Sequence, residues 1–290
     1  MTSAPTPTIA LLGTGTMGEP IGQNLIRAGF ALRAWNRSSD KAKPLAEAGA
    51  TVATSPAEAV DGAELVVTVL YDADAVAEVM QQARSGLKAG ATWIQVSTVG
   101  VEGCQRLAEL AAEYGLNFVD APVLGTKQPA VEGKLVVLAS GPDQARDRCQ
   151  PVFEAIAART LWVGSAGSGS KLKLVANAWV LAVVEGIAES LTLARELGLD
   201  PHLFLDAVAG GAMDAPYVQL KGKSMIEGDF SPSFGVSGAA KDGGLILAAA
   251  EQAGVDMAIT RAAKGFLDRA AAAGHADDDL SATYLAERSG

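Results

Sequence analysis

The sequence predicts an α/β domain followed by an all-α domain, with one long helix joining the two. Short apolar segments alternate with helical patterns through the first half of the chain, and the strand patterns stop after Gly169. The apolar run at 8–12 also leads straight into three spaced glycines and then into a helical pattern. Alternation of this kind indicates parallel strands joined by crossover helices.

The expected strands are short, and the run at 65–70 is continuously apolar, as in a strand covered on both faces. Strands are expected near 8–12, 30–35, 65–70, 92–96, 117–120, 134–139 and 159–163. Helices of the second half are expected near 171–197, 201–209, 214–226, 238–253 and 258–273. A glycine-rich turn at 164–169 separates the two patterns, so we expect one domain over 1–164 and a helical domain over 165–290.

The long expected helix from 172 to 197 is mostly apolar. Asn177, Glu185 and Glu189 interrupt its apolar run, whereas a membrane span needs roughly 20 apolar residues. We therefore expect a core helix or a dimer helix.

The three spaced glycines form the pattern Gly13-x-Gly15-x-x-Gly18 between a strand and a helix. Gly13 permits a tight turn, Gly15 lets the backbone approach a phosphate, and Gly18 lets helix and strand pack closely. The helix N-terminus offers unpaired N–H groups to anionic oxygens. The pattern predicts that the first domain is a dinucleotide-binding Rossmann domain. The residues expected to contact the pyrophosphate are Gly13, Gly15, Thr16, Met17 and Gly18.

Residues 36–38, after the second expected strand, indicate which of the two nicotinamide cofactors, NAD(H) or NADP(H), is preferred. An NAD-type site usually ends this strand in Asp or Glu, which binds the ribose 2′-hydroxyl and repels a 2′-phosphate. Asn36 removes that charge, Arg37 offers a forked cation suited to a phosphate, and Ser38 adds a hydroxyl donor. NADP(H) is therefore preferred over NAD(H). A solvated loop arginine is the alternative interpretation of Arg37.

Composition and charge narrow the function classes. The formal net charge of −10 argues against a nucleic-acid partner, for which a basic face is expected. Cys104 and Cys149 are too far apart for a disulfide framework, and no Cys/His spacing predicts a metal. The acidic run 277–279 lacks the spacing of a calcium loop and is expected to be a solvated turn. Residues 1–8 lack the regions of a signal peptide, so we expect a short disordered lead and a cytoplasmic location.

A second group of polar residues follows the glycine-rich turn. Lys173 and Asn177 lie four residues apart near the start of the long helix, so their side chains share one face. The positive end of the helix dipole and an apolar environment disfavour the cationic form of such a lysine, which can then exchange protons. In a hydride transfer, Lys173 would donate a proton to a carbonyl oxygen while Asn177 positions the lysine or that oxygen. A lysine that merely extends into solvent explains the same spacing.

The order and spacing of these motifs resemble the β-hydroxyacid dehydrogenase family over nearly the whole chain. The motifs are Gly13-x-Gly15-x-x-Gly18, Asp120-Ala-Pro-Val-Leu-Gly125, Gly167-x-Gly169-x-x-x-Lys173-x-x-x-Asn177 and Lys241-Asp242. The family comprises 3-hydroxyisobutyrate dehydrogenases, tartronate semialdehyde reductases and glyoxylate/succinic semialdehyde reductases. The resemblance implies a Rossmann domain, a long interdomain helix and an all-helical C-terminal domain. In the family, a second copy of the chain usually covers the long helix.

The resemblance also implies roles for individual residues. Lys173 would be the general acid/base, assisted by Asn177. Further positions that would contact the cofactor are Leu70, Tyr71, Thr98 and Lys241. Positions that would contact the substrate are Ser97, Leu124, Gly125, Thr126, Phe234 and Asp242. Without the resemblance, Phe234 would be interpreted as a core residue and 241–242 as a solvated helix face.

One departure from the family pattern concerns the substrate. Where the family has Asp-Ala-Pro-Val-Ser-Gly-Gly, Leu124 replaces the serine that binds the substrate carboxylate, and Thr126 replaces the second glycine. Loss of such a hydroxyl weakens acid binding by about 1–3 kcal/mol, unless Thr126 or Lys127 substitutes for it. The run Lys127-Gln-Pro-Ala130 nevertheless resembles the glyoxylate/succinic semialdehyde subgroup. If Leu124 determines the pocket, a less polar carbonyl or a cyclic imine would suit it better.

The sequence thus predicts an NADPH-dependent oxidoreductase that acts on a small aldehyde, ketone or 3-oxo acid, or in reverse a 3-hydroxyacid dehydrogenase. An imine reductase of the same architecture is the alternative, although imine reductases generally carry Asp or Tyr near the position of Lys173. A non-catalytic NADP-binding module is the third possibility, and it would be expected to lose the proton donor. The expected partners are a small-molecule substrate and further copies of the chain, as a homodimer or homotetramer, with no nucleic acid, membrane or metal.

Overall fold

The computed structural model describes residues 7–287, which pack into two compact units. The first unit ends at Lys173 and the second begins at Leu174. The disordered lead expected at the N-terminus falls largely on residues 1–6, which lie outside the described residues.

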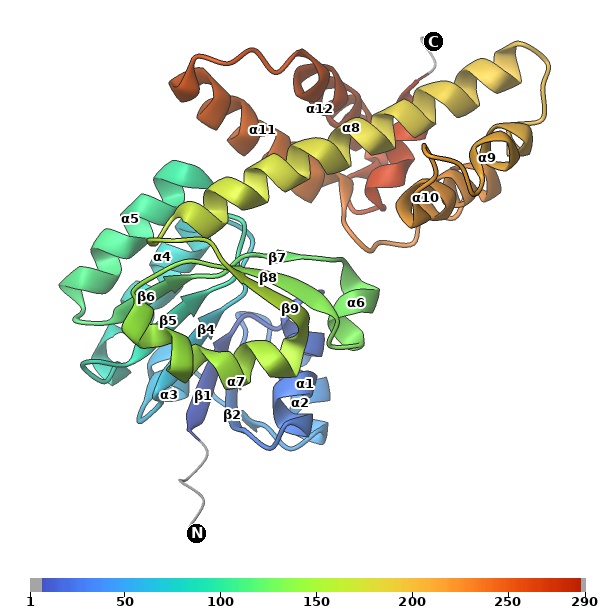
Figure 1. Cartoon of the computed structure of the whole chain (residues 1–290). Helices are drawn as coiled ribbons and strands as arrows, with labels where there is room; N and C mark the ends of the chain where they lie inside the picture. The colour runs from blue at the N-terminus through green and yellow to red at the C-terminus, as the bar shows by residue number, and fades with distance from the viewer. Residues whose placement is uncertain (1–6, 288–290) are drawn as a thin grey trace. The chain divides into compact units, whose positions relative to one another are not determined.

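The first unit is built on a six-stranded parallel sheet, with the strand order β3-β2-β1-β4-β5-β6 (Figure 1). Its strands are β1 (Thr8–Leu12), β2 (Ala31–Trp35), β3 (Thr51–Val52), β4 (Leu65–Thr68), β5 (Thr92–Gln95) and β6 (Asn117–Asp120). This doubly wound order reverses direction between β1 and β4, and in such sheets ligands bind outside the carboxyl ends of the strands at that point. The predicted α/β Rossmann domain is confirmed.

Helices cover both faces of this sheet, which explains why its strands are apolar throughout. On β1, Ile9 and Leu11 pack into one buried cluster, whereas Ala10 and Leu12 pack into the other. The first cluster includes residues of α1 (Gly18–Arg27), α2 (Lys43–Glu47), α6 (Lys127–Val131) and α7 (Arg146–Ile156). The second cluster includes residues of α3 (Pro56–Val60), α4 (Ala73–Ala83) and α5 (Gly100–Glu113). Short 3-10 turns are η1 (Ser39–Ala42), η2 (Arg84–Gly86) and η3 (Asp143–Ala145).

A separate three-stranded sheet, with the order β7-β8-β9, completes the first unit. Its elements are β7 (Val123–Leu124), α6 (Lys127–Val131), β8 (Leu135–Ala139) and β9 (Ala157–Trp162). β7 pairs antiparallel to β8, whereas the alternating pattern indicates parallel strands only. Because β7 has two residues, it is too short to show a periodicity in the sequence.

The second unit consists of helices, as predicted. They are α8 (Ser168–Glu196), which begins in the first unit, then α9 (His202–Val208), α10 (Pro216–Glu227), α11 (Val236–Ala253), α12 (Ala258–Ala270), η4 (Ala271–His275) and η5 (Leu280–Ala286).

By length and composition alone, α8 could cross a membrane, which differs from the expectation that polar residues interrupt its apolar run. The core helices of globular domains pass the same test. One face of α8 is a core face of the second unit, and its buried residues include Leu181, Val184, Ile187, Ala188 and Leu191.

The acidic run near the C-terminus is not a solvated turn throughout, contrary to the expectation. Asp279 is 2% exposed, and its carboxylate forms an ion pair with Lys221 of α10 at 2.7 Å. It also accepts hydrogen bonds from the side chains of Ser233 and Ser281. Burial raises the pKa of Asp279, but the bonds from Lys221 and Ser233 outweigh burial and hold that pKa below its usual range. The carboxylate therefore links η5 to α10 and to the loop before α11.

A second buried carboxyl, Glu185 of α8, makes the stability of this unit dependent on pH. Its Oε2 accepts a hydrogen bond from Thr283 Oγ1 at 3.0 Å. Burial, the neighbouring carboxyl of Glu287 and the charge of Glu189 raise the pKa of Glu185 from 4.5 to about 9, although the Thr283 bond acts against them. Below pH 4.5 the carboxyl is protonated in both the folded and the unfolded chain. Between 4.5 and 9 folding requires proton uptake, so stability falls as the pH rises through this window.

Glu185→Gln is therefore expected to raise the free energy of unfolding near pH 8 by about 1–3 kcal/mol, and to have little effect near pH 4.5. Glutamine keeps the shape and the acceptor of the protonated acid but needs no proton. Urea unfolding at several pH values measures the difference. Glu251→Gln, an exposed change on α11 of the same unit, should alter stability by less than about 0.5 kcal/mol. A gain for Gln at position 185 that does not grow with pH would contradict the assignment.

Candidate active site

The glycine turn between β1 and α1 has the geometry that its sequence predicts. Gly13 has a φ of +104°, and its N–H donates to the carbonyl of Trp35 at 2.9 Å. A Cβ on Gly13 would lie 2.2 Å from the carbonyl oxygen of Val69, and one on Gly18 would lie 2.0 Å from that of Gly13. The fold itself therefore requires both glycines.

Gly15 differs from these two, because a Cβ there would meet no atom within 4 Å. The packing of the protein does not explain this glycine, and the space beside it is available to a ligand. Met17 caps α1 without a side-chain hydrogen bond, whereas the Glu19 N–H is bonded to the Gly15 carbonyl at 3.0 Å and Pro20 has no N–H. An anion would therefore meet the N–H groups of the turn itself, ahead of Glu19. The turn thus fits the pyrophosphate of a dinucleotide.

The loop after β2 is tied to the glycine turn by Asn36. Its Oδ1 accepts a hydrogen bond from the Thr14 N–H at 3.0 Å, and its Nδ2 donates to the Ser38 carbonyl at 3.1 Å. Arg37 and Ser38 are exposed beside it. Asn36 therefore has a positioning contact, and the guanidinium of Arg37 is presented to solvent.

The loops after β4 and β5 are joined by Ser97, which is buried at the carboxyl end of β5. Its hydroxyl accepts from the Leu70 N–H at 2.8 Å. The amide of Gln95 holds the Ser97 backbone through two bonds of 2.7 and 2.8 Å. The Ser97 hydroxyl proton remains available for a further acceptor. Tyr71 is 56% exposed and Thr98 half-buried in the same two loops.

The segment in which Leu124 and Thr126 replace the serine and the second glycine of the family pattern lies at β7 and just after it. Leu124 is half-buried on this strand, opposite Val136 of β8. Gly125 follows with a φ of +117°, and Thr126 leads into α6. The Leu124 side chain supplies no hydrogen-bond donor, so Thr126 holds the nearest side-chain hydroxyl in this segment.

The first turn of α8, which leads to Lys173, is fixed to the end of β6 by residues that the sequence argument missed. Asp120 accepts from the Ser170 N–H and from the Ser170 hydroxyl, each at 2.7 Å. The Ser140 hydroxyl lies 3.1 Å from the same carboxylate and accepts from the Gly169 N–H. Lys173, three residues beyond Ser170, is half-buried. Asp120 stands in a quoted motif, but its partner lies 50 residues away and the motif does not reveal it.

In the second unit, Asn177 and Asp242 form a buried pair. The Asn177 Nδ2 donates to Asp242 Oδ2 at 2.6 Å and so links α8 to α11. The Lys241 ammonium lies 2.9 Å from Asp242 Oδ1, an ion pair without hydrogen-bond geometry. Phe234 is half-buried just before α11. The structure therefore brings Asn177, Lys241 and Asp242 together, and the interpretation of 241–242 as a solvated helix face is wrong.

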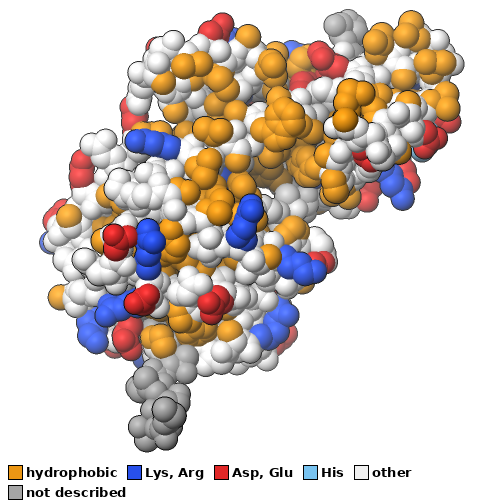
Figure 2. Space-filling view, viewed as in Figure 1, with side chains coloured by type: hydrophobic (Ala, Val, Ile, Leu, Met, Phe, Trp, Pro, Cys, Tyr) orange, Lys and Arg blue, Asp and Glu red, His pale blue; other side chains and the backbone are white. Residues whose placement is uncertain are grey.

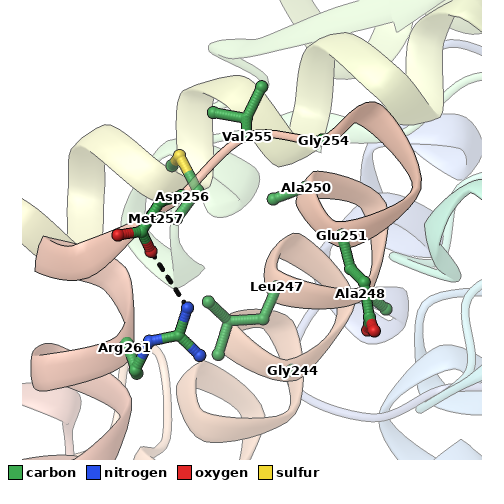
Figure 3. A pocket seen from close by; sticks show the side chains of 10 residues that line it. All are labelled: Gly244, Leu247, Ala248, Ala250, Glu251, Gly254, Val255, Asp256, Met257 and Arg261. Carbon is green, nitrogen blue, oxygen red and sulfur yellow. Dashed lines mark hydrogen bonds and ion pairs between the residues drawn. The ribbon is translucent and has the colours of Figure 1, made fainter.

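A pocket of about 630 Å³ in the second unit is not part of this site (Figure 3). It lies between the end of α11 and the start of α12. Its lining residues are Gly244, Leu247, Ala248, Ala250, Glu251, Gly254, Val255, Asp256, Met257 and Arg261. Asp256 and Arg261 pair with each other at 3.0 Å, and no residue predicted for catalysis or binding lines the pocket.

Comparison with known proteins supports the interpretation of both halves. Residues 8–164 match the NAD-binding domain of 6-phosphogluconate dehydrogenase. Residues 167–286 match the NAD-binding domain of NADP-dependent 3-hydroxyisobutyrate dehydrogenase.

Individual relatives agree over the full length. The chain is 33% identical to glyoxylate/succinic semialdehyde reductase 1 of Arabidopsis thaliana, covering 96% of this chain and 97% of that protein. It is 33% identical to the chloroplastic reductase 2 of the same plant, covering 97% of this chain and 79% of that protein. A solved structure of 3-hydroxyisobutyrate dehydrogenase from Mycobacterium tuberculosis with L-serine has a TM-score of 0.88, at 29% identity over 98% of this chain and 100% of that one.

The glycine turn, the strand order and the helical second unit therefore agree with these matches. The protein is an NAD(P)-dependent oxidoreductase acting on hydroxyl groups, and it belongs to the β-hydroxyacid dehydrogenase family.

Proposed function

We propose that this protein is an NADPH-dependent reductase of small aldehydes, ketones or 3-oxo acids, or in reverse a 3-hydroxyacid dehydrogenase, with Lys173 as the general acid/base. The observation that carries this proposal is the attachment of α8 to the carboxyl end of β6, next to the Ser97 loop of β5. Lys173 follows Ser170 by three residues, about 4.5 Å along the helix axis. It therefore lies near the sheet edge at which dinucleotides bind.

The residues of the glycine turn would hold the pyrophosphate, and the loops of Leu70, Tyr71 and Thr98 would cover the nucleotide. When bound, the reduced nicotinamide supplies a hydride. Lys173 would give its ammonium proton to the carbonyl oxygen in reduction and take it back in oxidation. Asn177, fixed by Asp242, would orient the reacting oxygen or the lysine. Ser97 would donate its free hydroxyl proton to a polar group of the substrate.

The preference for NADPH rests on Arg37. The Arg37 guanidinium is exposed, and Asn36 beside it brings no charge that would repel a phosphate. A charge-assisted hydrogen bond contributes about 1.5–3 kcal/mol, equivalent to roughly 10–100-fold in affinity.

Arg37→Ala is expected to weaken NADPH binding by about 10–100-fold and NADH binding by less than about 2-fold, because only NADPH carries the 2′-phosphate. Titration of each nucleotide, followed by protein fluorescence, measures both constants. Arg106→Ala removes the same charge from α5 and should change neither constant. Equal losses of affinity for the two nucleotides would show that Arg37 does not bind the 2′-phosphate.

The substrate is tested with a panel of carbonyls and NADPH, followed at the nicotinamide absorbance. The two plant relatives are named for glyoxylate and succinic semialdehyde, so these acids are compared with uncharged aldehydes and cyclic imines. Because Leu124 supplies no hydroxyl, we expect uncharged carbonyls to be the better substrates of the wild type. Leu124→Ser should lower KM for the acids by about 5-fold or more, equivalent to about 1–3 kcal/mol of binding. A clear wild-type preference for the acids would refute the prediction that Leu124 makes the substrate pocket apolar. Turnover of imines alone would favour an imine reductase.

We also propose that the enzyme is at least a homodimer, because α8 has an exposed apolar stripe opposite its core face. Hydrophobic side chains appear over this helix in Figure 2. The stripe contains Val175, Trp179 and Leu193, and Leu197 continues it just beyond the end of the helix; Trp179 is 71% exposed. A second copy would cover it. Light scattering is expected to give a dimer or tetramer that Trp179→Asp weakens, and a monomeric wild type would refute this proposal. We further propose that the substrate is a small molecule and that the enzyme is cytoplasmic.

A further inference from the structure

We propose that Asp120 is a positioning residue for the hydride-transfer reaction and that it acts through Ser170 to fix the helical turn carrying Lys173. The inference rests on the function proposed above. It adds a residue that touches neither the reacting atoms nor the glycine turn.

The contact is made by two atoms at each end. One oxygen of Asp120 accepts the Ser170 N–H and the other accepts the Ser170 hydroxyl, both at 2.7 Å. Together with the bond from the Gly169 N–H to the Ser140 hydroxyl, which itself donates to Asp120, this pair fixes both the position and the rotation of the first turn. Because a helix is stiff over one turn, the Cα of Lys173 is fixed with it.

The surroundings leave no room for adjustment. Asp120, Ser140 and Ser170 are all almost fully buried. A Cβ on Gly169 would lie 2.2 Å from the Leu138 carbonyl oxygen, so the backbone of α8 lies directly against the end of β8. The helix start therefore rests on two strands, and both Asp120 and Ser140 bond to it.

The carboxylate is costly to bury, which argues against an incidental helix cap. Burial raises the pKa of Asp120, although the bonds from Ser170 and Ser140 oppose that rise. A neutral side chain could cap the same helix, since serine and asparagine are about as good caps as aspartate. Only a carboxylate offers two acceptor atoms in one plane to the N–H and the hydroxyl of the same residue.

The test is a double-mutant cycle between positions 120 and 173. Asp120→Asn keeps the shape of the side chain but has one acceptor oxygen in place of two. We expect it to lower kcat by about 10–100-fold, the size of effect that a displacement of roughly 1 Å produces, while NADPH affinity stays within a few-fold. In the Lys173→Ala background the same change should lower the residual kcat by less than about 2-fold, because no lysine remains to be positioned.

Two serine variants complement the double-mutant cycle, one as a second test of the Asp120 contact and one as a control. Ser170→Ala removes one of the two bonds and keeps the backbone one, so we expect a kcat loss of about 3–10-fold, equivalent to about 1 kcal/mol. Ser190→Ala removes a hydroxyl bond of 2.7 Å farther along α8 and should leave kcat unchanged. Thermal melting of each variant with and without NADPH identifies any that fail to fold, and Ser170→Ala carries the test if Asp120→Asn does not fold.

A near-wild-type kcat for Asp120→Asn and Ser170→Ala would overturn the inference while leaving the proposed function intact. Equal kcat losses in both backgrounds would overturn it as well, because they would indicate general damage. Full activity of Lys173→Ala alone would instead refute the proposed function, and the inference with it. A loss confined to the background that contains the lysine supports positioning.

Discussion

Replacing Lys173 with alanine is expected to lower kcat by about 10³-fold, within the range usual for a lost general acid/base. NADPH affinity should stay within a few-fold, because the glycine turn and the loop of Arg37 hold the nucleotide without this lysine. Steady-state kinetics and nucleotide titration separate the two effects.

The sequence provides a matched control two residues earlier. Lys171→Ala removes the same charge from the same turn of α8, but Lys171 is exposed and its neighbour Ser170 still bonds to Asp120. Its kcat should remain within about 2-fold of the wild type, as expected for a surface substitution. Undiminished turnover by Lys173→Ala, or equal losses in both variants, would remove Lys173 from the mechanism.

Gly15→Ala is expected to weaken nucleotide binding without loss of stability, whereas Gly18→Ala is expected to destabilise the free protein. A Cβ at position 15 meets no atom of the protein within 4 Å, so Gly15→Ala should melt like the wild type without nucleotide. The methyl group would occupy the space beside the turn, and NADPH affinity should fall by about 10-fold or more. A Cβ at position 18 would lie 2.0 Å from the Gly13 carbonyl oxygen, so Gly18→Ala should destabilise the free protein by roughly 1–3 kcal/mol or more.

Thermal melting without nucleotide and NADPH titration measure the two variants side by side. The contrast isolates the role of the ligand, because both substitutions add one methyl group to the same turn. If Gly15→Ala bound NADPH as tightly as the wild type, the pyrophosphate could not lie against this glycine.

Most of the fold could be predicted because its signals are local. The continuous apolar run at β4 marks a strand with two covered faces, and all four residues of that strand are buried. The glycine spacing fixed the turn between β1 and α1, where two of the three glycines prove sterically required. β3 and β7, with two residues each, are too short for any periodicity to appear.

The site is partly predictable for the same reason. The loops at the carboxyl ends of β1, β2 and β5 follow their strands directly, so their residues could be named from the sequence. Asp120 with Ser170, and Asp279 with Lys221, are pairs separated by 50 and 58 residues, and only the folded chain brings them together. An acidic run has the same composition whether it is solvated or buried against a lysine, which is why the solvated turn was the wrong expectation for Asp279.

A crystal structure of the enzyme with NADP⁺ and a bound substrate or hydroxy-acid product tests the central claim most directly. We predict that the Lys173 Nζ lies within hydrogen-bond distance of the reacting oxygen, and that the reacting carbon faces C4 of the nicotinamide. A complex in which this nitrogen points into solvent, away from both substrate and coenzyme, would contradict the account.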